Sequence, residues 1–383
     1  MPPKPSDYFL SDADNAAIFE QQIRPAEFGQ QKDEELAIAT EGNAKARPVC
    51  IILAGQTGAG KSHAAPALVA ALNKIAASSS PLCHLVADTH KPYHPAYAGL
   101  VADAAAGRAP PGLASAATGH DARRWLARSC AVAAAQRRTA LVESASRYPQ
   151  DVVEMATTFQ TQGYRVCLVL LGVHAAQSRL GLLARFLEAS TSLADKNKIE
   201  DTENRRPKMP VRLTPRSIHD ESFVGLASLA KMLDAQGSGS APGQQDKEKI
   251  LADEVLILRR GNQVAYANHW QQATRSWQTT PPGVSQALAA ERARRWTSKE
   301  SHDGQDSQVN VTSPLAKETA LFASDVARLR AAHPDRADEL DALTAEYEAT
   351  IVSEDGETGG GKEAEYCPLN PDALVAHLQS NQW

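Results

Sequence analysis

The amino-acid sequence predicts an α/β fold in which helices flank a mainly parallel β-sheet. Short apolar segments rich in β-branched residues are typical of buried parallel strands, and they occur at residues 49–53, 83–88, 139–144 and 165–173. Alanine- and leucine-rich stretches of helical character separate them, at residues 62–77, 121–136 and 149–162. Strands and helices that alternate in this way indicate βαβ units with helices on both faces of the sheet.

Composition limits the classes of function. The chain has 383 residues, of which 43% are hydrophobic, so it can bury a core and is long enough for two medium domains or one large domain with appendages. Its formal net charge of −5 argues against a nucleic acid as partner. No apolar run is long enough for a membrane span, and the N-terminus lacks the order of a secretory signal. The scattered cysteines indicate reduced core residues, so we expect a cytoplasmic protein, which leaves open its delivery into another cell.

The pattern of polar and apolar stretches divides the chain into parts. We expect an N-terminal polar and helical extension, a main α/β domain, and a helical C-terminal region with flexible spacers, at residues 1–46, 47–270 and 271–383. Inside the main domain, the charged stretch 194–210 indicates a mobile loop and the Gly/Ser/Gln-rich stretch 236–249 a linker. Two alternating runs around Arg-Gly-Asn at 253–268 predict a hairpin, and residues 214–235 predict a helix.

A glycine-rich loop follows the first predicted strand and precedes the first predicted helix. It matches G-x-x-x-x-G-K-[ST] in full, with Gly55, Gln56, Thr57, Gly58, Ala59, Gly60, Lys61 and Ser62. The glycines let backbone N–H groups turn toward a phosphate, and the helix N-terminus adds partial positive charge. Lys61 can bridge the β- and γ-phosphates, and the Ser62 hydroxyl can ligate Mg²⁺. We therefore predict binding of ATP or GTP with Mg²⁺.

Two carboxylates stand where the second and third predicted strands end. They are Asp88 in "HLVADTH" and Glu143 in "ALVESASR". Because the carboxyl ends of parallel strands meet at one edge of a sheet, both would lie beside the phosphate loop. One carboxylate acting as general base for an acceptor hydroxyl, with another near Mg²⁺, is the equipment of a kinase.

Several ordered elements between residues 45 and 270 resemble the zeta toxin family. "VADTHKPYHPAYAGL" (86–100) resembles its D-x-[FL]-R-x-x-H-P-x-[YF] element, and "LVESASRYP" (141–149) resembles [IV]-E-G-T-x-R-x-P. "RLTPRSIHDESFVGL" (212–226) resembles R-x-x-P-x-x-x-H-D-x-x-x-x-x-L. The segment 163–188 is similar to a strand and helix that carry an arginine near the helix end, here Arg185, and 255–268 is similar to the closing strands of the family.

Zeta toxins are P-loop kinases, so the resemblance implies a P-loop kinase-like sheet and transfer of the γ-phosphate of ATP or GTP to a sugar hydroxyl. The acceptor it implies first is a nucleotide sugar, UDP-N-acetylglucosamine, and second a dinucleotide, NAD. It also implies a bacterial toxin or effector with an antitoxin protein as partner. Neither a membrane nor a nucleic acid is expected as partner.

The resemblance assigns roles position by position. Asp88 matches the general base; Lys61, Arg185 and Arg212 match groups that surround the transferred phosphate; Glu143, Arg147, Lys91 and His94 match acceptor-side residues. The loop at 194–210 then stands where a closing lid would lie. Two departures lie on the acceptor side: Ser144-Ala145 replaces the family's Gly-Thr, and Lys91 replaces an arginine, which keeps the charge and loses the bidentate fork.

The residues also allow other interpretations. His94-Pro95 suits a packing and turn element, Glu143 a structural partner of Lys61 or Arg147, and His219-Asp220 the start of a helix. As a whole, the chain could be a non-toxic kinase of a small molecule, nucleoside or antibiotic. It could instead be a nucleotide-gated interaction protein that uses its C-terminal helices. A further hypothesis is that residues 1–47 or those helices block the nucleotide site in cis.

Overall fold

The fold is taken from a computed structural model of the chain. It describes residues 3–29, 47–76, 82–110, 112–195, 214–236, 251–259, 262–278, 283–293, 296–297, 323–331, 333–334, 337–348, 351–352 and 367–368. Nearly all of the loop predicted at 194–210 and of the linker predicted at 236–249 lies outside these residues.

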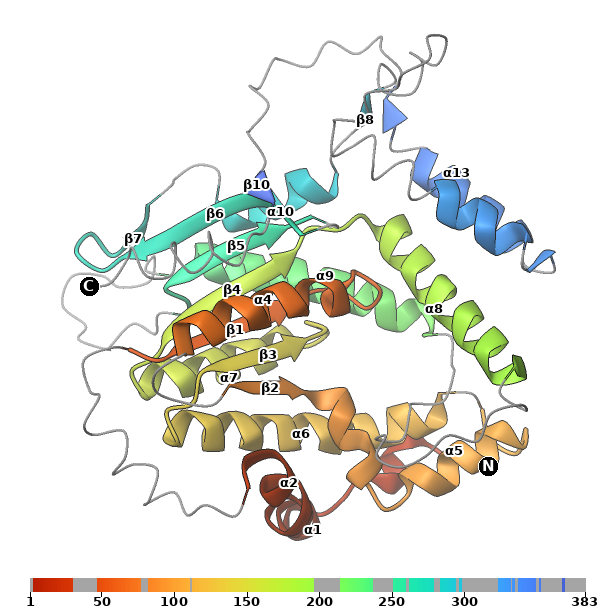
Figure 1. The fold of residues 1–383 in the computed structure, drawn as a ribbon, viewed down its shortest axis with the longest axis horizontal. Coiled ribbons are helices and arrows are strands. Elements are labelled where there is room, and N and C mark those ends of the chain that lie inside the picture. Colours follow the sequence, from red (N-terminus) through yellow and green to blue (C-terminus); the bar gives the residue numbers. More distant parts are fainter. Residues whose placement is uncertain are drawn as a thin grey trace.

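A mixed β-sheet forms the centre of the molecule (Figure 1). Its strands are β1 (Val49–Ala54), β2 (Cys83–Val86), β3 (Ala140–Ser144), β4 (Arg165–Leu171), β5 (Glu254–Leu258), β6 (Gln263–Gln271), β7 (Ser276–Trp277) and β10 (Cys367–Pro368). Within the described residues the order is β10-β6-β5-β4-β1-β3-β2, and β7 pairs with β6. Strands β2, β3, β1, β4 and β5 are parallel, whereas β6 runs antiparallel to β5. The predicted parallel strands and the predicted hairpin are thus confirmed.

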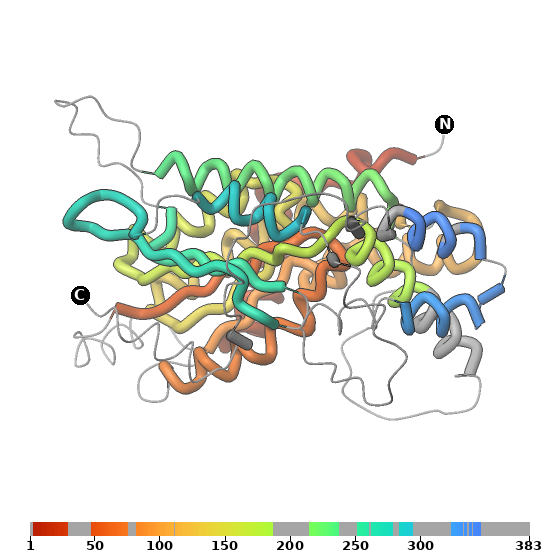
Figure 2. Tube along the Cα trace, turned by 90° about the horizontal axis from the view of Figure 1, so that it is seen from above, coloured from red at the N-terminus to blue at the C-terminus, as the bar shows by residue number. Residues whose placement is uncertain are grey.

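Helices cover both faces of this sheet. They are α1 (Asp12–Ile18), α2 (Arg24–Phe28), α4 (Lys61–Ala76), α5 (Tyr97–Ala105), α6 (Leu113–Ala135), α7 (Pro149–Thr161), α8 (Ala175–Asp195), α9 (Arg216–Asp234), α10 (Val284–Arg292) and α13 (Ala337–Glu348). Shorter helical turns are η1 (Pro5–Tyr8), η2 (Phe19–Ile23) and η3 (Ala87–Tyr93). Seen along the sheet, α4 lies on one face and α9 with α10 on the other (Figure 2). The short strands β8 (Trp296–Thr297) and β9 (Ile351–Val352) pair with each other.

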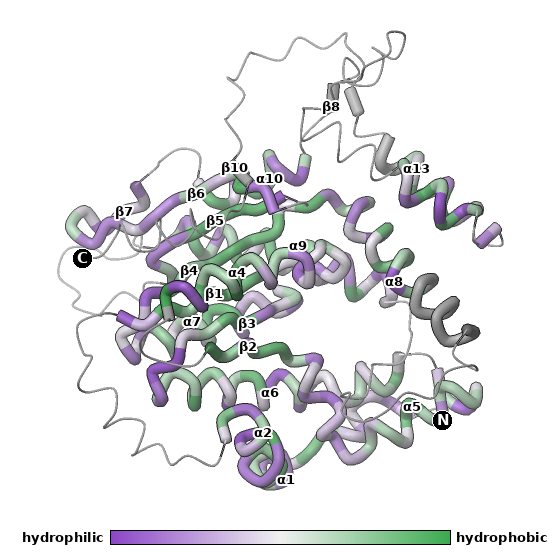
Figure 3. Tube along the Cα trace, in the orientation of Figure 1, coloured by the Kyte–Doolittle hydropathy of each residue, from purple (hydrophilic) through white to green (hydrophobic). Residues whose placement is uncertain are grey.

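Strand β1 shows why the sheet needs helices on both faces. Ile51 and Leu53 pack with Leu68 and Leu72 of α4, whereas Ile52 belongs to the cluster on the opposite face. Because successive side chains of a strand point to opposite faces, a strand buried on both sides is apolar throughout. Figure 3 shows this as hydrophobic colour concentrated on the central strands. Each such side chain stabilises the fold by about 1.5–3 kcal/mol relative to exposure.

The N-terminal segment 3–29 packs on α6. Phe19 and Ile23 form a buried cluster with Ala122 and Trp125, and the Trp125 indole N–H donates to the carbonyl oxygen of Asn15 at 2.8 Å. Phe19 and Ile23 are therefore covered by the main domain, and the position of the segment is fixed by contacts far apart in sequence.

The C-terminal helices pack on α8. Leu180 and Leu183 of α8 are buried against Leu329 of helix 323–331 and Leu340 of α13. The apolar faces of these helices, which the sequence also allowed to be partner-binding surfaces, thus contact the chain itself.

The described cysteines are free and buried, as predicted: Cys50, Cys83, Cys130 and Cys167. Burial raises the pKa of the Cys167 thiol to about 12, so it stays protonated and unreactive. Within the residues that the structure describes, every helix is too short or too polar to cross a bilayer.

Candidate active site

The glycine-rich loop turns from β1 into α4 at the carboxyl edge of the sheet. Gly58 and Gly60 adopt φ values of +81° and +97°, a region that residues with a Cβ avoid. The Gly55 N–H donates to the carbonyl oxygen of Ser144 at 3.1 Å, which ties the loop to the end of β3. The loop therefore has the backbone conformation in which successive N–H groups can face an anion.

Helix α8 touches the phosphate loop through glycine on both sides. A Cβ on Gly58 would lie 1.9 Å from the carbonyl oxygen of Ser178, and a Cβ on Gly181 would lie 2.7 Å from the carbonyl oxygen of Gly58. Neither position has room for a side chain, so the close backbone approach requires both glycines.

Lys61 begins α4, and its side chain lies back across the loop. Its Nζ donates to the carbonyl oxygens of Gly55 at 2.8 Å and Gln56 at 3.4 Å. These neutral acceptors leave the positive charge of the ammonium available to an anion that enters the loop.

The charges of three other predicted site residues act on Lys61. Burial lowers the pKa of Lys61 to about 8; Glu143 and Asp88 raise it, and Arg185 lowers it further. Glu143 lies on β3, Asp88 in η3 and Arg185 on α8, so the charges that act on Lys61 come from three different elements of the fold. Among the predicted residues, Arg212 lies outside the described part of the chain.

Asp88 lies in η3, directly after β2, and its side chain is 57% exposed. Lys91, one turn on, is buried and places its Nζ 2.6 Å from Asp88 Oδ1 and 2.5 Å from the hydroxyl of Ser115. The ammonium thus holds one oxygen of a carboxylate whose side chain is largely exposed. Lys91, predicted on the acceptor side, contacts the predicted base.

Buried histidines anchor the segment that carries Asp88. His90 Nε2 lies 2.7 Å from Glu27 Oε1, and His94 Nε2 lies 3.1 Å from the carbonyl oxygen of Tyr8. His94 Nε2 also lies 3.4 Å from Oδ2 of Asp121 on α6. Because Glu27 and Tyr8 both belong to the N-terminal segment 3–29, that segment holds η3 in place through the two histidines.

Glu143 ends β3 with its side chain mostly buried. Its Oε1 lies 2.9 Å from Nε2 of His84 on the neighbouring strand β2. Arg185 lies on α8 with its side chain exposed. The Glu143 carboxylate is therefore held by a residue of the neighbouring strand, whereas Arg185 lies on the surface of a helix.

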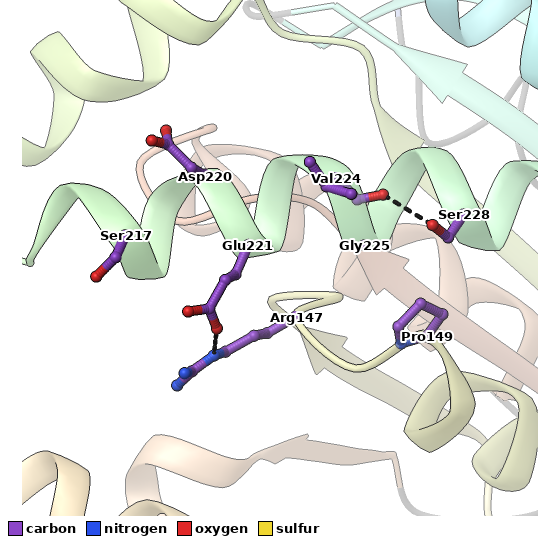
Figure 4. A pocket seen from close by; sticks show the side chains of 8 residues that line it. All are labelled: Arg147, Pro149, Ser217, Asp220, Glu221, Val224, Gly225 and Ser228. Atoms are coloured by element: carbon purple, nitrogen blue, oxygen red, sulfur yellow. Dashed lines mark hydrogen bonds and ion pairs between the residues drawn. The ribbon is translucent and has the colours of Figure 1, made fainter.

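A groove runs between α9 and the segment that follows β3 (Figure 4). It has a volume of about 570 Å³ and is lined by Arg147, Pro149, Ser217, Asp220, Glu221, Val224, Gly225 and Ser228. Arg147 reaches across to Glu221, with which it forms an ion pair. Gly225 allows α9 to approach the turn after β3 closely, because a Cβ at this position would lie 1.9 Å from the carbonyl oxygen of Ser146.

The segment in which Ser144-Ala145 replaces the family's Gly-Thr forms a tight turn that ends at Ser146. The Ser144 hydroxyl accepts from the Ser146 N–H at 3.0 Å, and Ser146 has a φ of +55°. The Ser146 hydroxyl is buried, and no hydrogen bond is found for it among the described residues.

His219 connects α9 to the loop region. Its Nε2 lies 2.7 Å from the hydroxyl of Ser178, the residue whose carbonyl contacts Gly58, and its Nδ1 lies 2.9 Å from Asp220 Oδ1. The hydrogen bond with His219 lowers the pKa of the Asp220 carboxyl. The imidazole thus couples α9 to α8 rather than only stabilising the first turn of α9.

Residues that sequence reasoning missed also lie in this region. Ser178, Gly181 and Arg292 contact the phosphate loop, and Glu221 holds Arg147. Only the G-x-x-x-x-G-K-[ST] spacing carries a local signal, so nothing in the sequence near these residues could have singled them out.

The parallel sheet, the phosphate loop after β1 and the helix that follows define a P-loop nucleotide-binding protein with a kinase-like fold. A sequence model described as zeta toxin matches residues 33–271. The chain belongs to the zeta toxin family, which confirms the resemblance noted from its motifs.

Two solved structures resemble the chain. One comes from the PezAT chromosomal toxin–antitoxin system of Streptococcus pneumoniae, with 16% identity and a TM-score of 0.50, covering 84% of this chain and 98% of that chain. The other is the AvrRxo1-ORF1:-ORF2 structure with ATP, with 14% identity and a TM-score of 0.39, covering 88% of this chain and 86% of that chain. The search of curated proteins gave no significant match.

Proposed function

We propose that the protein is a kinase that transfers the γ-phosphate of ATP or GTP to a sugar hydroxyl of a nucleotide metabolite. The observation that carries the proposal is the set of charges around Lys61. Two carboxylates, Glu143 and Asp88, and one further cation, Arg185, act on the ammonium of the phosphate loop. A loose phosphoryl-transfer state needs cations around the phosphate and a base beside it.

In this proposal Asp88 is the general base. Its exposed carboxylate accepts the proton of the acceptor hydroxyl while that oxygen forms a bond to the γ-phosphorus and the bond to the β-phosphate oxygen breaks. The nucleoside diphosphate leaves with the electron pair of the broken bond. Lys91, bound to Asp88 Oδ1 at 2.6 Å, fixes the rotamer so that the other oxygen faces the acceptor.

The residues at the loop fit a magnesium ion. Mg²⁺ prefers oxygen ligands, and the exposed Ser62 is the second residue of α4, beside Lys61, on which the carboxylates of Glu143 and Asp88 act. Ser62 would supply a ligand, and the carboxylates would hold its water shell. Bound there, the ion would neutralise charge on the β- and γ-phosphates.

The groove beside Arg147 is the proposed acceptor side. It offers an arginine for an acceptor phosphate, carboxylates and serines for sugar hydroxyls, and the apolar surface of Val224 and Pro149. UDP-N-acetylglucosamine is the first acceptor we propose and NAD the second. The turn at Ser144 and Ser146 and the use of Lys91 to hold Asp88 distinguish this side from the family pattern.

The test is phosphoryl transfer from γ-labelled ATP with Mg²⁺ to UDP-N-acetylglucosamine, other UDP-sugars, NAD and a metabolite extract. Mass spectrometry locates the added phosphoryl group. We expect Asp88→Asn to abolish transfer and to leave the dissociation constant for ATP nearly unchanged. Asp103→Asn is the matched control, because Asp103 is an exposed carboxylate on α5 and pairs with Arg108, which follows the helix. Transfer at the wild-type rate by Asp88→Asn would refute the base assignment.

The proposed biological role is that of a toxin or effector whose partner is an antitoxin protein. Growth arrest on expression that Asp88→Asn relieves would support it, and expression without arrest would favour a non-toxic small-molecule kinase. A nucleotide-gated interaction protein is disfavoured, since Leu329 and Leu340 of the C-terminal helices are buried against α8. Binding of ATP without phosphorylation of any acceptor would support a nucleotide-gated interaction protein instead.

A further inference from the structure

A buried arginine from α10 contacts the phosphate loop from behind. Arg292 is the last residue of α10, and its side chain is only 7% exposed. Its Nη2 donates to Gln56 Oε1 at 3.0 Å, and its Nη1 donates to the carbonyl oxygen of Phe223 at 2.9 Å. The guanidinium also lies over the Phe223 ring, 3.7 Å from the ring centroid. One side chain therefore joins α10, α9 and the loop.

Among the described residues, no carboxylate forms an ion pair with Arg292. Burial lowers its pKa to about 10, and no charged residue contributes to the shift within the part of the chain that the structure describes. An arginine in this environment remains protonated at neutral pH. A buried cation is unfavourable unless hydrogen bonds compensate it, and here one of its hydrogen bonds goes to Gln56 of the phosphate loop and another to the carbonyl oxygen of Phe223 in α9.

Gln56 carries the effect of Arg292 into the loop. Its side chain is fully buried and donates from Nε2 to the carbonyl oxygen of Val173 at 2.8 Å, while Oε1 accepts from Arg292. Its main-chain oxygen accepts from the N–H of Ala59 at 3.1 Å and from Lys61 Nζ at 3.4 Å. Since both ends of the Gln56 amide are fixed, the loop carbonyl that orients Lys61 is fixed with them.

From this geometry we propose that Arg292 is a positioning residue of the nucleotide site. It holds Gln56, and through it the phosphate loop, in the conformation that accepts a triphosphate. Residue 292 lies beyond the family match, which ends at residue 271, so α10 is a part of the nucleotide site that the match does not include. The proposal rests on the nucleotide binding that belongs to the proposed function.

Helix α10 also has anchors that do not touch the loop, and these supply the control. Arg259 and Glu291 form a buried bidentate ion pair, with Arg259 Nη2 2.8 Å from Glu291 Oε2. At the other end of the helix, Asp234 accepts from the N–H groups of Val284 at 2.6 Å and Ser285 at 2.9 Å. Replacing the Arg259–Glu291 pair therefore changes an anchor of α10 without removing a bond to Gln56.

The experiment measures the dissociation constant of Mg²⁺-ATP by calorimetry on the full chain, with folding checked by circular dichroism and melting temperature. The variants are Arg292→Met, Gln56→Met, their combination, and the double control Arg259→Met with Glu291→Met. We expect Arg292→Met and Gln56→Met each to raise the dissociation constant about tenfold, and their combination to raise it no further. Because replacing both members of a buried ion pair by apolar side chains leaves little net change in stability, the control should fold and change the dissociation constant less than about twofold.

Outcomes separate a positioning role from a purely structural one. A folded Arg292→Met protein that binds ATP as the wild type does would overturn the proposal, and so would a control that weakens binding equally. If Arg292→Met does not fold, Gln56→Met makes the same test from the loop side, and unchanged binding there also overturns it. Because binding is measured without turnover, a failure to find any acceptor would refute the kinase and leave this result standing.

Discussion

Replacing Gly58 or Gly60 by alanine separates the backbone strain of the phosphate loop from its contact with α8. Both glycines have positive φ values, +81° and +97°, so alanine is strained at either position. Their surroundings differ. A Cβ on Gly58 would lie 1.9 Å from the Ser178 carbonyl oxygen and 2.8 Å from Leu182 Cγ, whereas a Cβ on Gly60 meets nothing within 4 Å.

The expected magnitudes follow from these distances. Left-handed backbone costs a residue with a Cβ about 1–2 kcal/mol, and this contribution is common to both variants. Alanine also lowers the conformational entropy of the unfolded chain, and this effect is likewise common to both variants. Gly58→Ala must also displace a main-chain carbonyl of α8, and overpacking of this kind costs about 1–3 kcal/mol more. We therefore expect the free energy of unfolding to fall by about 1–3 kcal/mol more in Gly58→Ala than in Gly60→Ala.

Urea denaturation followed by circular dichroism measures this difference, and calorimetry measures the binding of Mg²⁺-ATP to each variant. Gly58→Ala should also bind the nucleotide more weakly, because its loop can relax only by moving away from α8. If the two free energies of unfolding agree within about 0.5 kcal/mol, the close approach of loop and helix does not exist as described.

Three further predictions concern other parts of the site. The pKa of Lys61 is lowered from 10.5 to about 8, so its ammonium loses its proton as the pH rises from 7 to 9, and the affinity for ATP should fall over this range. The free energy of unfolding should rise between pH 8 and 10.5, because there the unfolded chain binds more protons than the folded one. Calorimetry in buffers of different ionisation enthalpy should detect proton uptake on ATP binding, and Lys61→Met should abolish this uptake. Lys91→Met should lower kcat roughly tenfold to a hundredfold and leave the KM for ATP within about twofold, because it releases the Asp88 carboxylate; an equal rise in KM would instead place Lys91 at the nucleotide. Leu340→Ala should weaken the docking of α13 on α8 by about 2–5 kcal/mol, so limited proteolysis should remove the C-terminal helices before the sheet domain is cut, and unchanged resistance would contradict the packing.

The parts of the fold that the sequence predicted are those with local patterns. The strands at 49–53 and 165–173 consist mainly of apolar, β-branched residues, which is typical of a sheet buried on both faces. The phosphate loop has a spacing set by backbone geometry, and the hairpin at 253–268 has the turn residues that its pairing requires. Each of these signals lies within a few residues and needs no knowledge of tertiary contacts.

The parts that could not be predicted depend on contacts between distant segments. Arg292 lies in "AERARRW", where nothing distinguishes it from the neighbouring arginines until α10 is placed beside Gln56. Lys91 was assigned to the acceptor by resemblance, and its contact with Asp88 depends on the burial that α6 provides through Ser115. Gly181 and Gly225 read as unfavourable helix residues in sequence, and they become required only where another backbone approaches.

The proposed donor and acceptor sides of the site are built from different kinds of contact, and this difference bears on specificity. The loop meets α8 through main-chain atoms at Gly58 and Gly181 and meets α10 through the buried Gln56, so substitutions there disturb packing as well as binding. On the acceptor side, Arg147 and Glu221 line an open groove with side chains that solvent reaches. Substitutions in such a groove usually change stability by less than about 0.5 kcal/mol. A chain of this fold can therefore change its acceptor while it keeps its nucleotide, which fits the departures at Ser144 and Lys91. The acceptor screen should accordingly extend beyond the first two candidates.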